Sequence, residues 1–309
     1  MTSHKQNNAL FTVAASYLVW GIIPLFWSLF SGIGSMYTLA QRIVWSVILL
    51  ALFILLTGRG PALRTALSSR RIIFTCFLSS ILITMNWGLY IYAVTSGRVL
   101  DSSLGFYMVP VVAGIMSVLL LKEHLSVWEW ITLFISGAGL AYAVICMGFF
   151  PLLSLLIAAT FAGYGAVKKN LSVDSFLSLF IETVLVLPFA LGYILIQERT
   201  GHGFMESFTG IRFFLLPLSG LATILPLLLF NLGVSGIPYY ITGILTYINP
   251  TMQFLLGIFY FREAPDRNRM VLTLIIWTGV LFTVYDRLRR IRQNHRSALT
   301  TGGKSIGEI

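Results

Sequence analysis

Two stretches of the chain carry the same pattern: FYMVPVVAGIMSVLLLKE at residues 106–123 and TYINPTMQFLLGIFYFRE at residues 246–263. Each contains a Tyr, a Pro three residues later, a largely apolar run, and then a basic residue followed by Glu. Corresponding residues of the two copies, such as Tyr107 and Tyr247, differ by a constant 140 positions. A pattern that recurs at a fixed offset predicts an internal duplication.

The composition places this duplication in a lipid environment. Of the 309 residues, 57% are hydrophobic and only 10% are charged, and the mean hydropathy is +0.86. An average water-soluble domain carries about 25% charged residues. A helix needs about 20 apolar residues to cross the hydrocarbon core of a bilayer. The sequence therefore predicts an all-α polytopic membrane protein.

Ten apolar stretches of suitable length follow one another along the chain. They lie at roughly 9–30, 37–57, 72–95, 100–121, 127–147, 150–168, 175–196, 211–234, 238–261 and 268–286. Only the connections 57–71 and 197–210 exceed a tight turn, which leaves no room for a separate soluble domain. The first stretch lacks a convincing cleavage pattern and is interpreted as a retained helix.

The basic residues predict how these spans are oriented. If the N-terminus is cytoplasmic, fourteen of the 21 Lys and Arg residues fall in inside segments and six in outside segments. The positive-inside rule then predicts that both termini lie in the cytoplasm. A nucleic-acid-binding surface is excluded, because the charges that give a net +10 lie in separate short loops.

Five spans separate the fourth span from the ninth, so the second copy of the pattern enters the membrane in the opposite direction. The sequence thus predicts two inverted five-helix repeats, 1–148 and 149–309, the second with a basic cytoplasmic tail. Gly139 and Gly279, in the fifth and tenth spans, keep the same offset. Inverted repeats are the architecture of secondary transporters, because two similar halves of opposite orientation can exchange conformations.

Several further motifs accompany the repeated stretch. They are AASYLVWGIIPLFW (14–27), QRIVWS (41–46), NWGLYIYAV (86–94), LGFYMVPVV (104–112), GYGAVKKN (163–170), FIETVLVLP (180–188), TILPLLLF (223–230) and YINPTMQFLLGIFYFRE (247–263). Together they resemble the RarD-type branch of the EamA-like drug/metabolite transporters over nearly the whole chain. The resemblance implies ten helices in two EamA-type repeats, an inner-membrane location and export of a small molecule.

Aromatic and amide residues near the middle of the spans are candidate walls of a substrate cavity, because polar groups in hydrocarbon are costly unless they are satisfied. The candidate substrate-binding residues are Trp20, Asn86, Trp87, Tyr90, Tyr107, Tyr164, Tyr247 and Asn249. Prolines free a backbone carbonyl and kink a helix. The candidate hinges are Pro24, Pro110, Pro226 and Pro250. Such a lining suits a modest, partly apolar organic solute, whereas the alternative for each residue is packing between helices.

Two charged residues lie inside spans, at nearly symmetric positions of the two halves. Arg42 is one to two turns into the second span from outside, and Glu182 is about two turns into the seventh from inside. One interpretation makes Glu182 a coupling group for a proton or cation and Arg42 a contact for an anionic solute. In the structural alternative, Arg42 reaches outward to polar groups and Glu182 pairs with Lys168 or Lys169. A direct Arg42–Glu182 pair is not expected.

The sequence contains no pattern for catalysis or for binding a nucleotide, cofactor or metal. The four histidines lie in loops or tails, and the two cysteines lie inside spans. The nucleophile-elbow, zinc-protease and P-loop motifs are missing. The pairs Lys122–Glu123 and Arg262–Glu263 are interpreted as helix-boundary markers.

The predicted function is therefore a secondary transporter that exports a small organic metabolite or drug-like solute by alternating access, without a cofactor. Its partners would be the solute and the lipid bilayer, and both a monomer and a homodimer fit the sequence. The alternative is a membrane-embedded binding or sensor protein without transport turnover.

Overall fold

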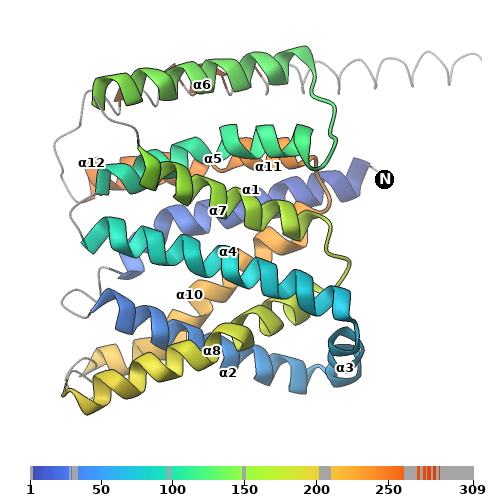
Figure 1. The fold of residues 1–309 in the computed structure, drawn as a ribbon, viewed down its shortest axis with the longest axis vertical. Coiled ribbons are helices and arrows are strands. Elements are labelled where there is room, and N and C mark those ends of the chain that lie inside the picture. Colours follow the sequence, from blue (N-terminus) through green and yellow to red (C-terminus); the bar gives the residue numbers. More distant parts are fainter. Residues whose placement is uncertain are drawn as a thin grey trace, which may run out of the picture. The chain divides into compact units, whose positions relative to one another are not determined.

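A computed structural model of the chain describes residues 3–27, 29, 34–95, 99–147, 151–201, 210–260, 270–271, 274–275, 277–279, 281–282 and 285. Within these residues the regular elements are all helical, as the composition predicts (Figure 1). The helices are α1 (Ser3–Trp27), α2 (Ser35–Leu56), α3 (Gly60–Ser68), α4 (Arg70–Thr95), α5 (Val99–Leu119), α6 (Val127–Met147), α7 (Leu152–Lys169), α8 (Ser175–Arg199), α10 (Ile211–Val234), α11 (Tyr239–Leu245) and α12 (Ile248–Phe259).

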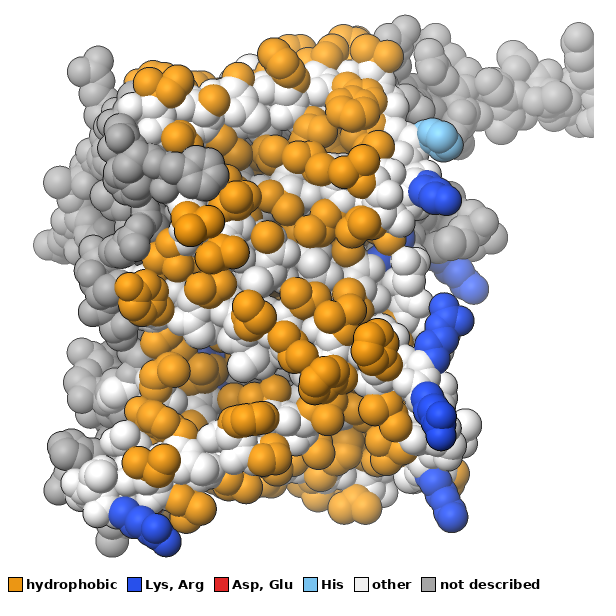
Figure 2. All heavy atoms as spheres, viewed as in Figure 1, with side chains coloured by type: hydrophobic (Ala, Val, Ile, Leu, Met, Phe, Trp, Pro, Cys, Tyr) orange, Lys and Arg blue, Asp and Glu red, His pale blue; other side chains and the backbone are white. Residues whose placement is uncertain are grey.

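Six of these helices are long and apolar enough to cross a membrane. The segments are Lys5–Phe26, Met36–Leu56, Arg70–Ala93, Leu152–Lys169, Ser175–Arg199 and Phe213–Val234, and Leu104–Leu119 of α5 is a shorter apolar helix. Their outward-facing side chains are hydrophobic: Phe74, Phe189 and Phe214 are each at least 66% exposed. Figure 2 shows hydrophobic side chains spread over the visible face. This surface suits lipid, and the chain folds as a multi-pass membrane protein.

The connection predicted at 57–71 contains the short helix α3. It begins with Pro61 in its first turn, where the missing backbone N–H of proline costs no hydrogen bond. Its one buried residue, Ala66, packs in a cluster with Cys76 and Ile181. A few apolar contacts therefore hold this connection against the N-terminal parts of α4 and α8.

The ninth predicted span, 238–261, is divided into α11 and α12 at Thr246 and Tyr247. Pro250 has no N–H to donate to the Thr246 carbonyl. That carbonyl accepts instead from the backbone N–H of Asn249 at 3.1 Å, and Thr246 and Tyr247 also donate to carbonyls three residues earlier. Next to Pro250 the chain therefore forms a tightened turn, in which these backbone groups remain hydrogen-bonded. The tenth predicted span is described only in part.

The described chain forms two compact units. Unit 1 comprises residues 1–123 and 151–263, and unit 2 comprises residues 124–150 and 264–309. Each unit thus includes residues from both sides of the predicted repeat boundary at 148/149. The units are groups of residues that contact one another, whereas the repeats are segments with a similar sequence pattern. The two predicted halves therefore remain a prediction from the sequence.

Within unit 1 the helices pack in pairs that repeat. The contact of α1 with α10 has its counterpart in the contact of α7 with α4. The contact of α5 with α7 has its counterpart in the contacts of α11 and α12 with α1 (Figure 1). α2 packs against α8, and α5 against α11. Two equivalent sets of helices would produce this pattern of neighbours.

Unit 2 is formed by α6 and the described residues between 270 and 285. Ser126 and Glu129 form a capping box at the start of α6: Ser126 N donates to Glu129 Oε2 at 2.7 Å, and Glu129 N donates to Ser126 Oγ at 3.2 Å. Thr132 Oγ1 donates to the Gly279 carbonyl at 2.6 Å. The Trp128 ring stacks on Phe282 at 5.9 Å between centroids. The predicted fifth and tenth spans therefore contact each other.

One glycine in unit 1 sets how closely two spans approach. A Cβ atom on Gly220 of α10 would lie 2.7 Å from the carbonyl carbon of Trp45 in α2. Ser46 Oγ donates to the Gly220 carbonyl across the same contact, at 3.4 Å. Small residues let membrane helices approach in this way. The approach brings Thr223, one turn further along α10, within hydrogen-bonding distance of Arg42.

We expect Gly220→Ala to lower the free energy of unfolding by about 1–3 kcal/mol, because the added methyl group overlaps the α2 backbone. Gly192→Ala in α8 is the matched control, since a Cβ there meets no atom within 4 Å. That variant should be neutral or up to about 1 kcal/mol more stable, because alanine favours a helix. Thermal unfolding in a single detergent measures both. Equal melting temperatures for the two variants would contradict this account of the α2–α10 contact.

Candidate functional site

A cavity of about 130 Å³ lies among the helices of unit 1. Its walls come from α1, α2, α4, α5 and α7 and from the region where α11 meets α12. The lining residues are Trp20, Ile23, Pro24, Arg42, Asn86, Trp87, Tyr90, Phe106, Phe161, Thr246, Asn249 and Gln253. Most of this wall is apolar or aromatic, with a few polar groups that could orient a bound molecule.

Among the described residues that line this cavity, Arg42 is the one with a charged side chain. Its Nε donates to Thr223 Oγ1 at 2.8 Å, and its Cζ lies 5.5 Å from the centre of the Trp87 ring. The hydrogen bond and the cation–π contact together fix the plane of the guanidinium. Around it, Leu39 and Ile43 of α2 are buried in the protein interior, which holds this part of the helix in place.

The two asparagines predicted as site residues both lie in the cavity wall. Asn86 Nδ2 donates to the Ile157 carbonyl at 2.8 Å and to Thr160 Oγ1 at 3.2 Å. Asn249 Oδ1 accepts from Gln253 Nε2 at 2.9 Å, one helical turn away. Each amide is therefore anchored to the protein as well as placed beside the cavity, as polar groups at membrane depth require.

The eight predicted binding residues divide into two groups. Five line the cavity: Trp20, Asn86, Trp87, Tyr90 and Asn249. The other three are buried and lie outside the described lining: Tyr107, Tyr164 and Tyr247. Among the predicted hinges, Pro24 lines the cavity, whereas the other three lie in α5, α10 and α12: Pro110, Pro226 and Pro250.

The tyrosines of the repeated stretch meet each other. The rings of Tyr107 and Tyr247 are 6.3 Å apart between centroids, tilted by 36°, and only 3% and 1% exposed. Their helices touch closely nearby, because a Cβ on Gly243 would lie 2.8 Å from that of Ala113. The two copies of the sequence pattern thus pack directly against one another.

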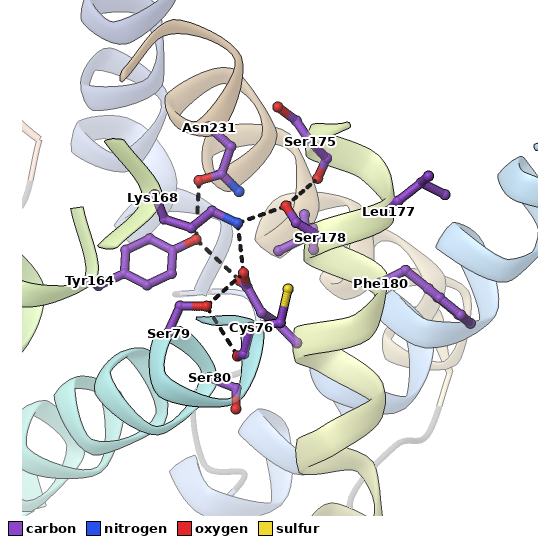
Figure 3. A network of polar contacts seen from close by, with 12 residues as sticks. Cys76, Ser79, Ser80, Tyr164, Lys168, Ser175, Leu177, Ser178, Phe180 and Asn231 are labelled. Carbon is purple, nitrogen blue, oxygen red and sulfur yellow. Dashed lines mark hydrogen bonds and ion pairs between the residues drawn. The ribbon is translucent and has the colours of Figure 1, made fainter. Parts of the chain in front are cut away.

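A second polar feature of unit 1 is a buried ion pair with its hydrogen-bonding neighbours (Figure 3). Lys168 Nζ of α7 lies 2.6 Å from Glu182 Oε1 of α8, and both side chains are no more than 3% exposed. Ser79 Oγ of α4 donates to the same carboxylate oxygen at 2.8 Å, and Lys168 Nζ donates to Ser178 Oγ at 2.7 Å. The structure therefore places Glu182 against Lys168, one of the two partners considered from the sequence.

Tyr164 extends this network to α10. Its hydroxyl lies 3.2 Å from Asn231 Oδ1 and 3.5 Å from Glu182 Oε2, so Asn231 is the nearer acceptor (Figure 3). The Tyr164 ring stacks on Phe230 at 6.0 Å between centroids, and Phe230 contacts Phe161 at 6.1 Å. Because Phe161 lines the cavity, a continuous row of rings joins the cavity wall to the ion pair.

Glu123, predicted as a boundary marker, reaches across to another helix. Its carboxylate accepts from the backbone N–H groups of Tyr239 and Tyr240 at 2.6 and 3.1 Å, at the start of α11. Lys169 Nζ lies 3.9 Å from the same carboxylate and donates to the Ile237 carbonyl. Glu123, just after α5, thereby links the end of this helix to the start of α11 and to the end of α7. Its predicted counterpart, Glu263, lies outside the described residues.

Sequence reasoning missed several residues of both features. They are Ile23, Phe106, Phe161, Thr246 and Gln253 in the cavity and Ser79, Ser178 and Asn231 in the network. Gln253 could have been found, because an amide one helical turn after Asn249 in an apolar span calls for a polar partner. The phenylalanines carry no such signal in a chain with 23 of them. Within the described residues, no group of three or more His, Cys, Asp or Glu side chains could hold a metal ion.

Comparison with known proteins agrees with this combination of a membrane bundle and an internal cavity. The EamA-like transporter family matches residues 7–145. The uncharacterized transporter YojE of Bacillus subtilis (strain 168) is 35% identical over 292 residues, which cover 94% of this chain and 97% of the relative. A solved crystal structure with 15% identity has the same fold, with a TM-score of 0.68 over 92% of this chain and 99% of the other.

The chain belongs to the EamA-like transporter family. Within that family it is a RarD-type member. The protein RarD of Streptomyces exfoliatus is 34% identical to it, over 94% of this chain and 92% of the relative. The protein RarD of Escherichia coli (strain K12) is 27% identical, over 96% of this chain and 100% of the relative.

The buried ion pair gives a test of the network. We expect Glu182→Gln and Lys168→Met each to lower the free energy of unfolding by about 3–5 kcal/mol, because each leaves an uncompensated buried charge. The double variant should regain much of that loss, since no charge then remains unpaired. Unfolding curves of the four proteins in one detergent measure the coupling.

Arg59 provides the matched control. Its Nη1 lies at the same distance, 2.6 Å, from Asp174 Oδ2, but these side chains are 37% and 39% exposed. Arg59→Gln should therefore cost about 1 kcal/mol or less, because water screens exposed pairs. Losses of similar size at the two sites, or additive losses in the Lys168 and Glu182 double variant, would contradict the assignment of a buried, coupled pair.

Proposed function

We propose that this protein is a secondary transporter that exports a small organic solute across the bacterial inner membrane by alternating access. The observation that carries the proposal is a cavity at one depth of the bundle and a closed polar and aromatic barrier at another. The names of the relatives support transport.

The order of residues along two helices supports this separation in depth. On α4, Ser79 of the ion-pair network precedes Asn86 of the cavity by seven residues, which is about 10 Å of helix rise. On α7 the order is reversed, with Phe161 of the cavity preceding Lys168 of the network by the same spacing. The two helices run in opposite directions in the predicted topology, so both place the network on the same side of the cavity.

The exposed basic residues support a cytoplasmic position for the network end. Five of the six exposed basic residues in the described part of the chain lie at the start of α1, in α3, at the start of α4 and just beyond α5: Lys5, Arg64, Arg70, Arg71 and Lys122. The sixth, Arg199, lies at the end of α8, in a predicted outside segment. Figure 2 shows Lys and Arg side chains along the edge of the view at which α3 lies in Figure 1. By the positive-inside rule this edge faces the cytoplasm. The cavity then lies toward the outer half of the membrane, and the barrier closes the cytoplasmic side.

The repeated packing within unit 1 and the contact between Tyr107 and Tyr247 support two inverted halves, 1–148 and 149–309. In such an arrangement the two halves exchange conformations to open the cavity to the other side. Pro110 and Pro250 lie beside the contact of the two halves and are proposed as hinges. Ser79 belongs to the half 1–148 and the Lys168–Glu182 pair to the half 149–309, so opening toward the cytoplasm would break the Ser79–Glu182 hydrogen bond. Glu182 is therefore proposed as the group through which a proton or cation couples to transport.

The orientation can be tested with single cysteines in a chain whose Cys76 and Cys146 are replaced by Ser. A thiol introduced by Ser68→Cys, at the exposed end of α3, should react with an impermeant reagent only from the cytoplasm. A thiol introduced by Thr200→Cys should react only from outside. Thr200 is preferred to Gly201, whose φ of +78° disfavours a side chain. The reverse pattern would invert the whole bundle in the membrane. Reaction of both thiols from the same side would remove the proposed inverted relation of the halves, because it requires an even number of spans between the two positions.

Alternating access can be tested with Thr246→Cys, at the cavity wall, in the same background. We expect a charged impermeant thiol reagent to react quickly from outside and more slowly from the cytoplasmic side, as minor inward-open molecules appear. Glu182→Gln should raise the cytoplasmic rate several-fold, because the barrier loses its ion pair. Arg59→Gln, which breaks an exposed pair, should leave it unchanged. A binding protein without turnover would react from one side only, with or without Glu182→Gln.

A further inference from the structure

The charges of the cavity wall restrict which solutes it can hold. Arg42 contributes one positive charge, and the described lining residues include no Asp or Glu. A cation in this cavity would be repelled by the guanidinium and would meet no carboxylate there. An anion would be attracted by the same guanidinium.

The hydrogen-bonding groups of the wall point to the same class of ligand. A guanidinium has five N–H donors, so Arg42 can keep its bond from Nε to Thr223 and also hold an oxyanion. Asn249 Oδ1 already accepts from Gln253, so the group that Asn249 offers a ligand is its NH₂. The indole N–H groups of Trp20 and Trp87 are donors only. Asn86 is the opposite case, because its NH₂ donates to the Ile157 carbonyl and to Thr160, which leaves its oxygen as an acceptor. The lining thus supplies several donors and at least one acceptor around one fixed cation.

The remaining wall fits an aromatic or similarly apolar body. Phe106 and Phe161 contact each other edge-to-face at 6.5 Å between centroids, and Trp20 contacts Phe161 in the same way at 5.7 Å. Tyr90 meets Phe106 at 5.8 Å. Rings arranged edge-to-face present both faces and edges to a flat ligand. The cavity, at about 130 Å³, is close in size to the cavities of about 150 Å³ that hold a benzene ring, so it restricts the apolar body of a ligand to about one ring.

We propose that the transported solute is a small aromatic monocarboxylate and that Arg42 is the residue that binds its carboxylate. The inference rests on the proposed function in taking this cavity as the solute site. The carboxylate would lie between Arg42 and the amide of Asn249, with the ring among Trp20, Phe106 and Phe161. A single positive charge matches a monoanion, and a dianion would leave a buried negative charge without a partner.

The experiment compares three probes of nearly equal shape that differ in charge: 3-phenylpropanoate, 3-phenylpropanamide and 3-phenylpropylamine. Binding to the purified full chain in detergent is measured by calorimetry at neutral pH. We expect the carboxylate to bind at least about tenfold more tightly than the amide, because a hydrogen bond between charged groups is stronger than one to a neutral group. The amine should bind most weakly.

The variants assign this preference to Arg42. Arg42→Gln should remove the preference for the carboxylate while keeping the affinity for the amide, which shows that the cavity is intact. Arg42→Lys should give an intermediate preference, because an ammonium keeps the charge but lacks the planar fork. Thr223→Val keeps the charge and removes its anchor, so it should weaken binding of the carboxylate several-fold and leave the amide unaffected. It provides a second reading should Arg42→Gln fail to fold.

Three results would overturn the inference: equal binding of the three probes by the wild-type chain, a preference for the carboxylate that survives Arg42→Gln, or no binding of any probe at concentrations up to about 10 mM, where even weak ligands are detected. Counterflow of labelled 3-phenylpropanoate into proteoliposomes separates this inference from the proposed function. Arg42-dependent binding without counterflow would leave the inference standing and contradict transport. Counterflow of only the amide or amine would support transport and contradict the inference.

Discussion

A charge placed inside a bilayer has no water to solvate it, so the protein itself must supply a partner. In unit 1, Glu182 and Lys168 are partners for each other, and the arrangement of the helices around them follows from this pairing. The pair joins α7 to α8, Ser79 adds α4, and Tyr164 links the group to Asn231 of α10. These four helices are therefore fixed relative to one another at one depth. Their packing elsewhere has to be compatible with that alignment.

The aromatic row between the ion pair and the cavity carries this constraint further. The Tyr164 ring contacts Phe230, and Phe230 contacts Phe161 in the cavity wall. The position of this wall therefore depends on where Tyr164 is held. Rings in contact transmit a displacement because the interior is closely packed. The site that we propose for the solute and the pair that we propose for coupling are thus joined by a physical path of side chains.

Much of this architecture could be predicted from the sequence because the bilayer imposes strong and simple rules on it. Length and apolarity predicted a helical membrane protein and the long spans among its helices. Pro250 predicted a kink in the span 238–261 but not its division into α11 and α12 at Thr246 and Tyr247. The depth of a residue was readable in the same way, which is why five of the eight candidate residues fall in one cavity.

Direction around the helix axis was much harder to read. A span that is apolar on all sides carries no periodic signal to tell a lipid-facing ring from a core ring. Tyr107 and Tyr164 therefore looked the same as Tyr90, although the first two are buried in packing contacts and Tyr90 lies at the cavity. The partner of Glu182 was also undecided, because Lys168 and Lys169 are adjacent and point to different neighbours: Lys168 to Glu182 and Lys169 to Glu123. Such choices are settled only by tertiary packing.

Arg42 and Glu182 are 140 positions apart, the same interval that separates the two tyrosines, and yet they carry opposite charges in different surroundings. A symmetric dimer of identical five-helix subunits would have to place the same residue at both positions. Joining two such units into a single polypeptide removes that restriction. One copy of the position could then become a recognition group beside the cavity while the other became part of a closure, and a mutation that retunes one need not disturb the other. The proposed duplication would thus have given selection two independently adjustable parts from a single ancestral residue.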